Sequence, residues 1–230
     1  MTALQAVNSQ HAAALKARTA WMASQDGSEP LSTSGTVVQF VEGHEIFAEA
    51  EEPEAFFKVV SGVVRVCKFL SDGRRQIEAF HVAGEMFGLE LGGERLLCAE
   101  AVSDCTLVSY RRRSIETLAL KDEKITRQLF QYAMQNLAHA QNHSLLLGRR
   151  GAAEKMASFL LSQAEHSADG RTVNLAMTRQ DIADYLGLTI ETVCRQLKQL
   201  REDGAISAKG TKILIQDRQS LAGCATMVMH

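Results

Sequence analysis

The sequence lacks the cysteine patterns on which small secreted domains and many metal-binding domains depend. No CxxC pair occurs in its 230 residues, and an odd number of cysteines is scattered along the chain: Cys67, Cys98, Cys105, Cys194 and Cys224. This arrangement argues against a disulfide framework, a zinc ribbon and an iron–sulfur cluster. We therefore expect no metal and no cofactor, and we expect most of these thiols to be buried as small hydrophobic side chains.

Two further features are missing, a membrane-crossing stretch and an excess of charge. No apolar run approaches the ~20 residues that cross a bilayer, and the segment "MTALQAVNSQHAAALKARTA" lacks the apolar core of a signal peptide. The expected location is the cytoplasm, without a membrane partner. Because the formal net charge is only −2, any contact with nucleic acid must come from a local arrangement of basic side chains.

The length of the chain and the changes in residue pattern along it indicate more than one domain, because 230 residues exceed the ~100 to 200 residues typical of one domain. The expected parts are an N-terminal extension (1–29), a β domain (30–120), a long helix (121–148) and a helix-turn-helix domain (149–230). The extension is polar and Ala-rich, and either a loosely ordered arm or a short helix around Trp21 fits it. The β domain has short β-type runs between turns, as in an antiparallel barrel or roll. Its clearest hairpin turns at Asp72-Gly73, where both residues are expected to supply positive backbone angles.

The long helix carries an apolar seam. Steps of three and four residues connect Phe130, Ala133, Leu137, Ala140, Ser144 and Leu147. A heptad seam of this length favours pairing with a second copy of the chain, although a helix buried within one chain is the alternative. Since no acidic residue lies on the seam, we expect a homodimer without any trigger. His139 and His143 are expected off the seam, facing solvent or other parts of the chain, because no third metal ligand is evident.

The segment "MTRQDIADYLGLTIETVCRQLKQLREDG" predicts a helix-turn-helix. Thr178 is a good N-cap, and Asp181 three residues later completes a variant of the capping box. Gly187 provides the tight turn, and the second helix begins at Ile190 and ends at Asp203-Gly204. The following stretch "AISAKGTKILIQ" predicts a short hairpin, which is the wing of a winged helix.

Glu191 and Arg195 lie four residues apart on the polar face of the second helix. There a guanidinium can pair with guanine and a carboxylate can accept from cytosine, each contact supplying ~1 to 3 kcal/mol of base discrimination. The alternative is a surface salt bridge of only ~0.3 to 0.5 kcal/mol. The capped helix before Glu191 and Arg195 and the wing after them favour the interpretation that these two residues contact DNA bases. Residues 151–230 hold nine basic and nine acidic residues, so we expect each subunit to be attracted only modestly to DNA phosphates. Binding of two subunits to one DNA site would therefore raise the affinity considerably.

Over roughly residues 30–218 the chain resembles the CRP/FNR family of transcription regulators. The helix-turn-helix segment and the wing "ISAKGTKILI" carry the resemblance, and "KVVSGVVRVCKFLSDGRRQIEAFHVAGEMFGLE" and "LLLGRR" are most similar to the FixK subgroup. The resemblance implies an α+β fold with an N-terminal antiparallel β-roll of the cyclic-nucleotide-binding type, a long dimerisation helix and a C-terminal winged helix-turn-helix. It also implies a dimeric activator that binds palindromic double-stranded DNA, works with RNA polymerase and serves nitrogen fixation and microaerobic metabolism.

The resemblance assigns roles residue by residue. Base contacts fall on Glu191 and Arg195, and a backbone or methyl contact falls on Thr192. Phosphate contacts fall on Thr178, Arg179, Gln180 and Lys198. Ile190 stands where CRP itself carries a base-reading arginine, and this departure favours the FNR-type palindrome TTGA(N6)TCAA.

Cys194 stands where FNR proteins carry a serine in the recognition helix. One interpretation is a substitution without consequence, in which the thiol touches a thymine methyl group like the hydroxyl it replaces. The other is a redox role, because an oxidised sulfur would place a bulky or charged group in the groove.

The family's usual sensors are missing. Residues 1–66 contain no cysteine, which excludes an FNR-type cluster. Arg95 matches the family's phosphate-binding arginine, but Leu89 and Leu96 replace its glutamate and serine partners, so a surface or structural role is expected for Arg95. A relative gated by a small molecule in the β-roll is the alternative function. An enzyme of the cupin type is not expected, because residues 30–120 contain no HxH pair.

Overall fold

The computed structural model describes residues 31, 34–90, 92–148 and 151–225. They form two compact units, one of the described residues up to Lys68 with those of Phe80–His139, and one of Phe69–Ala79 with the described residues from Ala140 onwards. The arm or short helix predicted for residues 1–29 lies outside the described residues.

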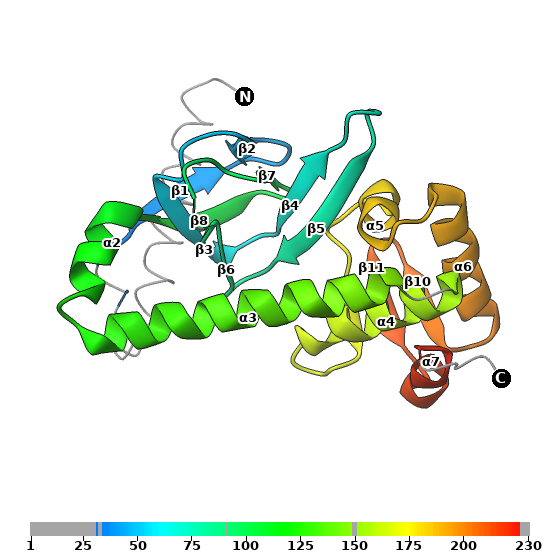
Figure 1. The fold of residues 1–230 in the computed structure, drawn as a ribbon. Helices are drawn as coiled ribbons and strands as arrows, with labels where there is room; N and C mark the ends of the chain where they lie inside the picture. Colours follow the sequence, from blue (N-terminus) through cyan, green and yellow to red (C-terminus); the bar gives the residue numbers. More distant parts are fainter. Residues whose placement is uncertain (1–30, 32–33, 91, 149–150, 226–230) are drawn as a thin grey trace, which may run out of the picture. The chain divides into compact units, whose positions relative to one another are not determined.

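Most of the first unit is an antiparallel β-roll of two sheets (Figure 1), whose strand β5 falls largely in the segment Phe69–Ala79 that groups with the second unit. One sheet has the order β1-β8-β3-β6 and the other β2-β7-β4-β5, and their recorded ladders are antiparallel. The strands are β1 Thr36–Phe40, β2 Glu45–Phe47, β3 Ala55–Ser61, β4 Val64–Phe69, β5 Arg75–His81, β6 Met86–Phe87, β7 Cys98–Ala101 and β8 Cys105–Arg111. The antiparallel roll predicted from the sequence is confirmed.

Inward-facing apolar side chains of both sheets fill the roll. Aromatic rings form its centre, with Phe57 stacked on Phe87 at 5.4 Å between centroids and Phe47 6.0 Å from Phe57. Branched residues such as Val64 and Leu107, both fully buried, complete this core. The alternation of buried and half-buried residues along the strands is what a pleated sheet with one covered face requires.

The β4–β5 hairpin turns differently from the sequence prediction. Gly73 has φ of 83°, but Asp72 is not among the residues with positive φ, so the expectation for Asp72 is wrong. The strands are joined by five residues rather than two, and Leu70 N donates to Arg74 O at 2.8 Å. A longer connection of this kind needs the left-handed conformation at one position only. The Asp72 carboxylate instead accepts from the backbone N–H of Arg74 at 3.0 Å.

Two helices follow the roll, α2 (Arg112–Ala119) and α3 (Glu123–Gly148). α3 is the single long helix predicted from the sequence. Its first turns pack Ile125, Leu129 and Tyr132 against a second apolar cluster of the roll. One face of α3 is therefore occupied within the chain, which leaves its other faces for solvent or a partner.

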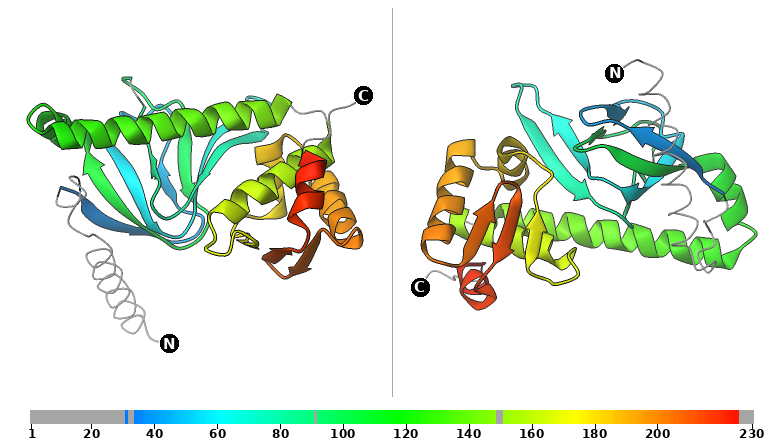
Figure 2. Two further views of the ribbon diagram at one scale, coloured as in Figure 1. Left: turned by 90° about the horizontal axis from the view of Figure 1, so that it is seen from below. Right: turned by 180° about the vertical axis from the view of Figure 1, so that it is seen from behind.

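The second unit is a winged helix-turn-helix. Its elements are α4 Ala152–Glu165, β9 Thr172–Asn174, α5 Arg179–Leu186, α6 Ile190–Glu202, β10 Ile206–Lys209, β11 Lys212–Ile215 and α7 Arg218–Ala225. The strands form a small sheet of order β10-β11-β9, and α7 lies against α4 (Figure 2). The predicted wing is confirmed: Lys209 pairs with Lys212, and the turn between them contains Gly210 at φ of 62°. Among the described residues, no helix has the length and apolar character that crossing a membrane requires.

Candidate nucleic-acid interface

The first motif helix, α5, begins with a complete capping box. The Thr178 hydroxyl oxygen accepts from Asp181 N at 3.1 Å, and the Asp181 carboxylate accepts from Thr178 N at 2.9 Å. Two N–H groups that a helix start leaves without partners are thereby satisfied. The helix ends at Gly187, whose φ of 61° suits a left-handed C-cap. Local sequence signals at both ends thus predicted this helix correctly.

The second motif helix, α6, presents a polar face to solvent. The Thr189 hydroxyl caps it by accepting from Thr192 N at 3.3 Å, and Val193 and Leu200 are buried on its inner side. The outer side carries four exposed residues that share one helical face: Glu191, Cys194, Arg195 and Lys198. The structure therefore brings the predicted base-reading residues together on one accessible surface.

Within the part of the chain that the structure describes, Glu191 and Arg195 form no ion pair with each other. Hydrogen bonds from its own backbone N–H and from the Thr189 hydroxyl lower the pKa of Glu191. Lys198 lies 3.6 Å from Glu202, and both side chains are exposed, a kind of contact that contributes little. Arg195 is thus available for a partner outside the chain.

The predicted phosphate contacts lie mainly at the start of α5. Thr178 and Gln180 are exposed there, and Arg179 is half-buried. The Gln180 amide donates to Asp184 at 2.7 Å. These side chains surround the N-terminal end of a helix, where the partial positive charge of the backbone favours anions.

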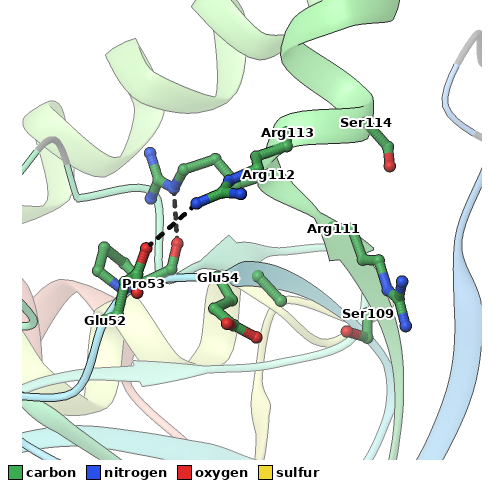
Figure 3. Close-up of a pocket in the computed structure, with 9 residues that line it drawn as sticks. Glu52, Pro53, Glu54, Ser109, Arg111, Arg112, Arg113 and Ser114 are labelled. Carbon is green, nitrogen blue, oxygen red and sulfur yellow. Dashed lines mark hydrogen bonds and ion pairs between the residues drawn. The ribbon is translucent and has the colours of Figure 1, made fainter. Parts of the chain in front are cut away.

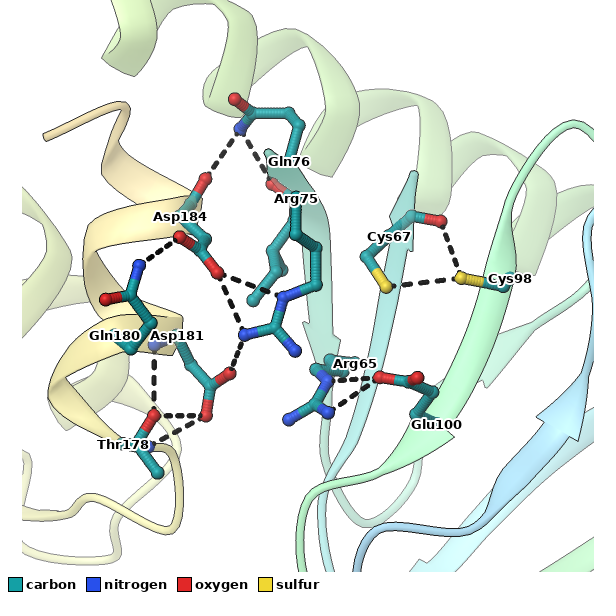
Figure 4. Close-up of polar contacts among 11 residues, drawn as sticks. Arg65, Cys67, Arg75, Gln76, Cys98, Glu100, Thr178, Gln180, Asp181 and Asp184 are labelled. Carbon is teal, nitrogen blue, oxygen red and sulfur yellow. Dashed lines mark hydrogen bonds and ion pairs between the residues drawn. The ribbon is translucent and has the colours of Figure 1, made fainter. Parts of the chain in front are cut away.

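Arg75 and Gln76, which were not among the predicted site residues, complete the surroundings of α5 (Figure 4). Both belong to Phe69–Ala79, the segment that groups with the helix-turn-helix. The Arg75 guanidinium pairs with Asp181 and with Asp184, the latter at 2.9 Å. Gln76 donates from its amide to the backbone oxygen of Asp184 at 2.9 Å. The carboxylate that caps α5 is therefore also the partner of an arginine about a hundred residues away in the sequence.

His143 and His139 have different surroundings. His143 is buried, its Nε2 lies 2.8 Å from the backbone oxygen of Tyr185, and its ring stacks on that of Tyr185 at 4.1 Å. This burial lowers the pKa of His143, whereas His139 is exposed. No group of three metal-ligating side chains is found among the described residues.

The proposed dimer seam on α3 is largely exposed. Phe130 is 64% exposed and Leu137 48%, Ala133 and Ser144 are also exposed, and Ala140 and Leu147 are half-buried. Leu147 lies beside the Gly187 turn, 3.5 Å from the position that a Cβ would take there. Two further exposed apolar residues, Met134 and Leu145, extend the stripe. Met134 lies four residues after Phe130, so the helical spacing in the sequence could have predicted it. α3 thus presents an apolar stripe that the described residues of the chain leave open.

Arg95, which the resemblance places at the family's phosphate-binding position, is buried in the roll and contacts other residues of the roll. Only 3% of it is exposed, and its Nη1 donates to Glu90 at 3.0 Å. Its guanidinium lies 3.6 Å from the centroid of the Phe47 ring, a cation–π contact. Arg95 is therefore structural, one of the two roles expected for it.

A cavity of about 550 Å³ opens on the roll at the start of α2 (Figure 3). Three arginines and two glutamates are among the residues that line it. Arg112 donates to the backbone oxygens of Pro53 at 2.8 Å and of Glu90 at 2.6 Å, and Arg113 lies 3.7 Å from Glu52. The cavity is thus lined by charges of both signs, and backbone oxygens already occupy the guanidinium of Arg112.

The comparisons with known proteins agree with this geometry. Residues 37–122 match the cyclic nucleotide-binding domain and residues 154–224 match the Crp-like helix-turn-helix domain. A nitrogen fixation regulation protein FixK from Azorhizobium caulinodans is 46% identical over 193 residues, which cover 81% of this chain and 78% of that protein. The chain belongs to the CRP/FNR family. It is a transcription regulator with a helix-turn-helix for DNA, and not an enzyme.

Within the CRP/FNR family, the chain is of the FixK type. The FixK protein of Rhizobium meliloti is 39% identical over 188 residues, covering 82% of this chain and 86% of that protein. The structure of FixK2 from Bradyrhizobium japonicum superposes with a TM-score of 0.80 at 41% identity, covering 85% of this chain and 99% of that one. The resemblance to this subgroup found in the sequence is confirmed.

Proposed function

We propose that this FixK-type regulator activates transcription as a ligand-independent homodimer on a TTGA(N6)TCAA-like palindrome. The names of its relatives suggest that the genes it controls serve nitrogen fixation. The resemblance to the FixK subgroup suggests that they also serve microaerobic metabolism. It acts in the cytoplasm together with RNA polymerase. The observation that carries the proposal is the outer face of α6, where Arg195 is exposed and has no ion-pair partner in the described chain.

Base reading is assigned to α6. Arg195 has the donor geometry for guanine O6 and N7, and Glu191 can accept from cytosine N4. Thr192 and Cys194 supply small contacts to backbone or thymine methyl groups. These residues share the face that remains after Val193 and Leu200 are buried, so the helix can enter a major groove without disturbing its own packing.

Phosphate contacts position α6 on the duplex. Thr178, Arg179 and Gln180 at the start of α5 fit one phosphate group, and Lys198 on α6 fits another. Such contacts fix register without specifying sequence. The second unit has no large basic surplus, so a single subunit is expected to bind weakly, and two subunits on one palindrome bind far more tightly.

Dimerisation is assigned to the apolar stripe of α3. The opposite face of its first turns is already packed on the roll, so Phe130, Ala133 and Leu137 are free for the same stripe of a second copy. Residues Ala140, Ser144 and Leu147 continue the seam. Two helices paired in this way place two recognition helices on one DNA face, as a two-fold palindrome requires.

The DNA assignment is tested by fluorescence anisotropy at fixed salt with reduced, ligand-free protein. We expect selective binding to the TTGA(N6)TCAA duplex over a scrambled duplex. Arg195→Ala is expected to lose ~1 to 3 kcal/mol per half-site, whereas Arg201→Ala, an exposed arginine in the last turn of the same helix, controls for the loss of one charge. Equal losses in both variants would remove the base-reading role. A requirement for an added small molecule would favour the ligand-gated alternative.

The dimer is tested separately by sedimentation equilibrium without DNA. Leu137→Glu places a carboxylate on the seam, and because burial of an unpaired charge is costly we expect monomers at concentrations where the natural protein is dimeric. Gln135→Glu adds the same charge at an exposed position off the seam and is expected to leave the dimer intact. A dimer that survives Leu137→Glu would contradict the assignment.

Cys194 is proposed as a redox-sensitive contact. It is exposed on the recognition face, so mild peroxide can reach it, and a sulfenic or higher acid there would hinder entry into the groove. We expect oxidation to weaken operator binding in the natural protein and to leave binding by Cys194→Ser unchanged. If both proteins lose binding equally, another residue is responsible.

A further inference from the structure

Two other cysteines face each other inside the roll. Cys67 on β4 and Cys98 on β7 are directly paired across the two strands, and their sulfur atoms lie 3.3 Å apart (Figure 4). Cys98 Sγ also lies 3.2 Å from the backbone oxygen of Cys67. Both side chains are buried, with exposed fractions of 0% and 4%. These thiols are scattered in the sequence and were expected to be small hydrophobic side chains, but the fold makes them a pair.

The positions suit a covalent bond between the two sulfurs. Residues directly opposite in an antiparallel ladder have Cα atoms roughly 4.5 to 5.5 Å apart, within the roughly 4.4 to 6.8 Å that disulfides span. The sulfurs need to approach by little more than 1 Å to reach the S–S bond length of about 2.05 Å. Two rungs away in the same ladder, the side chains of Arg65 and Glu100 pair at 2.6 Å, so the strand register that aligns the thiols is supported independently of them.

An oxidant can reach the pair by a small local opening. Cys67 and Cys98 form the last recorded rung of the β4–β7 ladder, and Cys98 is the first residue of its strand. The chain beside this rung is open to solvent, with Phe69 53% and Leu96 68% exposed. Ends of ladders open at lower free energy than their centres. Reaction at this rung therefore does not require the roll to unfold.

We propose that Cys67 and Cys98 are a dithiol site that a hydroperoxide converts reversibly into an intrachain disulfide. The Cys98 thiolate attacks the peroxide oxygen, the O–O bond breaks, and an alcohol, or water from hydrogen peroxide, leaves. Cys67 then attacks the Cys98 sulfenic acid, the S–S bond forms, and the sulfenic oxygen leaves as water. The two thiols lose two electrons and two protons, and the peroxide gains them. A small thiol reverses the change by exchange.

The remaining cysteines provide internal comparisons. Burial raises the pKa of Cys98, which keeps the thiolate scarce, so the pair is expected to react more slowly than the exposed Cys194. Cys105 is buried as well, and burial raises the pKa of its thiol to about 11. Cys105 lies on the other sheet of the roll. It is expected to stay a thiol under conditions that oxidise the pair.

The test is peptide mapping of the full chain with Cys194→Ser and Cys224→Ser, so that only the three roll cysteines remain. The folded protein is treated with hydrogen peroxide, unfolded in the presence of an alkylating reagent and digested with trypsin. Cleavage after the basic residues separates Val66–Lys68, with Cys67, from Leu96–Arg111, with Cys98 and Cys105. Fragmentation of the cross-linked product identifies which of the two cysteines is joined to Cys67.

We expect the product to join Cys67 to Cys98, to be two hydrogens lighter than the two separate peptides and to disappear on reduction. It should exceed any Cys67–Cys105 product by more than about tenfold, because only the aligned pair meets the disulfide geometry. Protein oxidised in urea should lose this selectivity. The variants Cys67→Ala and Cys98→Ala should each leave the remaining sulfur without a disulfide partner. Full alkylation of all three cysteines, sulfinic acids without a cross-link, or equal pairing with Cys105 would overturn the proposal.

Discussion

Replacing Arg75 by Met should destabilise the helix-turn-helix unit far more than replacing its neighbour Arg74. The Arg75 side chain is 16% exposed and pairs with Asp181 and Asp184, which are 2% and 13% exposed. Methionine keeps much of the volume of arginine but leaves both carboxylates without their cation. Removing one partner of a buried ion pair typically costs about 3–5 kcal/mol. Since Arg75 and Asp184 retain some contact with water, we expect a loss of about 2–4 kcal/mol in the free energy of unfolding.

Urea unfolding of the full chain, followed by circular dichroism, measures this loss. With a slope of about 1–3 kcal/mol/M, the midpoint of the transition that contains the helix-turn-helix should fall by about 1 M or more. Arg74→Met is the matched control, because Arg74 is 76% exposed and its ion-pair partner, Asp72, is half-exposed. Exposed pairs of this kind contribute at most about 1 kcal/mol, so its midpoint should hardly move.

A double-mutant cycle separates the ion pair from other effects of the substitution. Arg75→Met and Asp184→Asn should each destabilise the protein, and the double variant should lose less than the sum. Contacts of this kind couple by about 0.5–3 kcal/mol. If Arg75→Met loses no more stability than Arg74→Met, or if the two losses add without coupling, the contact between the β4–β5 hairpin and α5 does not stabilise the unit and the reasoning fails.

Three further predictions concern single positions. Burial lowers the pKa of His143 below its ordinary value of 6.5, so the unfolded chain binds a proton before the folded one does; the free energy of unfolding should therefore fall as the pH drops below about 6.5. His143→Gln should reduce this slope and His139→Gln should not, as measured by urea titrations between pH 7 and 5. Thr178→Ala removes the cap of α5 and should cost about 1 kcal/mol in thermal melts, whereas Thr178→Ser should retain the cap. Gly62 has φ of +88°, and Gly62→Ala would place a Cβ 2.5 Å from a backbone oxygen, so it should lower the free energy of unfolding in urea by more than about 3 kcal/mol. In Gly73→Ala the added Cβ meets no neighbouring atom, and the loss should be about 1–2 kcal/mol.

The sequence predicted the elements whose signals are local. The capping residues Thr178 and Asp181 are three residues apart, and the turn at Gly187 depends on that residue's own conformation. The wing follows from a glycine between two short apolar strands. Such signals operate within one turn of a helix or one hairpin, where spacing along the chain is nearly equivalent to spacing in space.

The features that the sequence did not predict depend on how distant strands are aligned. Cys67 and Cys98 are paired by the register of β4 and β7, and a shift of one residue would place one of them on the opposite face. Arg75 and Arg74 follow the same turn and look alike in the sequence, yet only Arg75 meets the carboxylates of α5. No pattern within a short window distinguishes these alternatives.

This distinction between local and distant contacts also explains how a nearly neutral unit can present a surface suited to DNA. Counting charges gives nine of each sign in residues 151–230, but the charges are not equally available. Asp181 and Asp184 share Arg75, whose single positive charge offsets one of their two negative charges and so weakens the negative field at the start of α5. Arg195 on α6 is exposed and has no such partner among the described residues. For the proposed contact with phosphates and bases, the relevant quantity is therefore the charge left after pairing within the protein, which favours an anionic partner at this face even though the total is neutral.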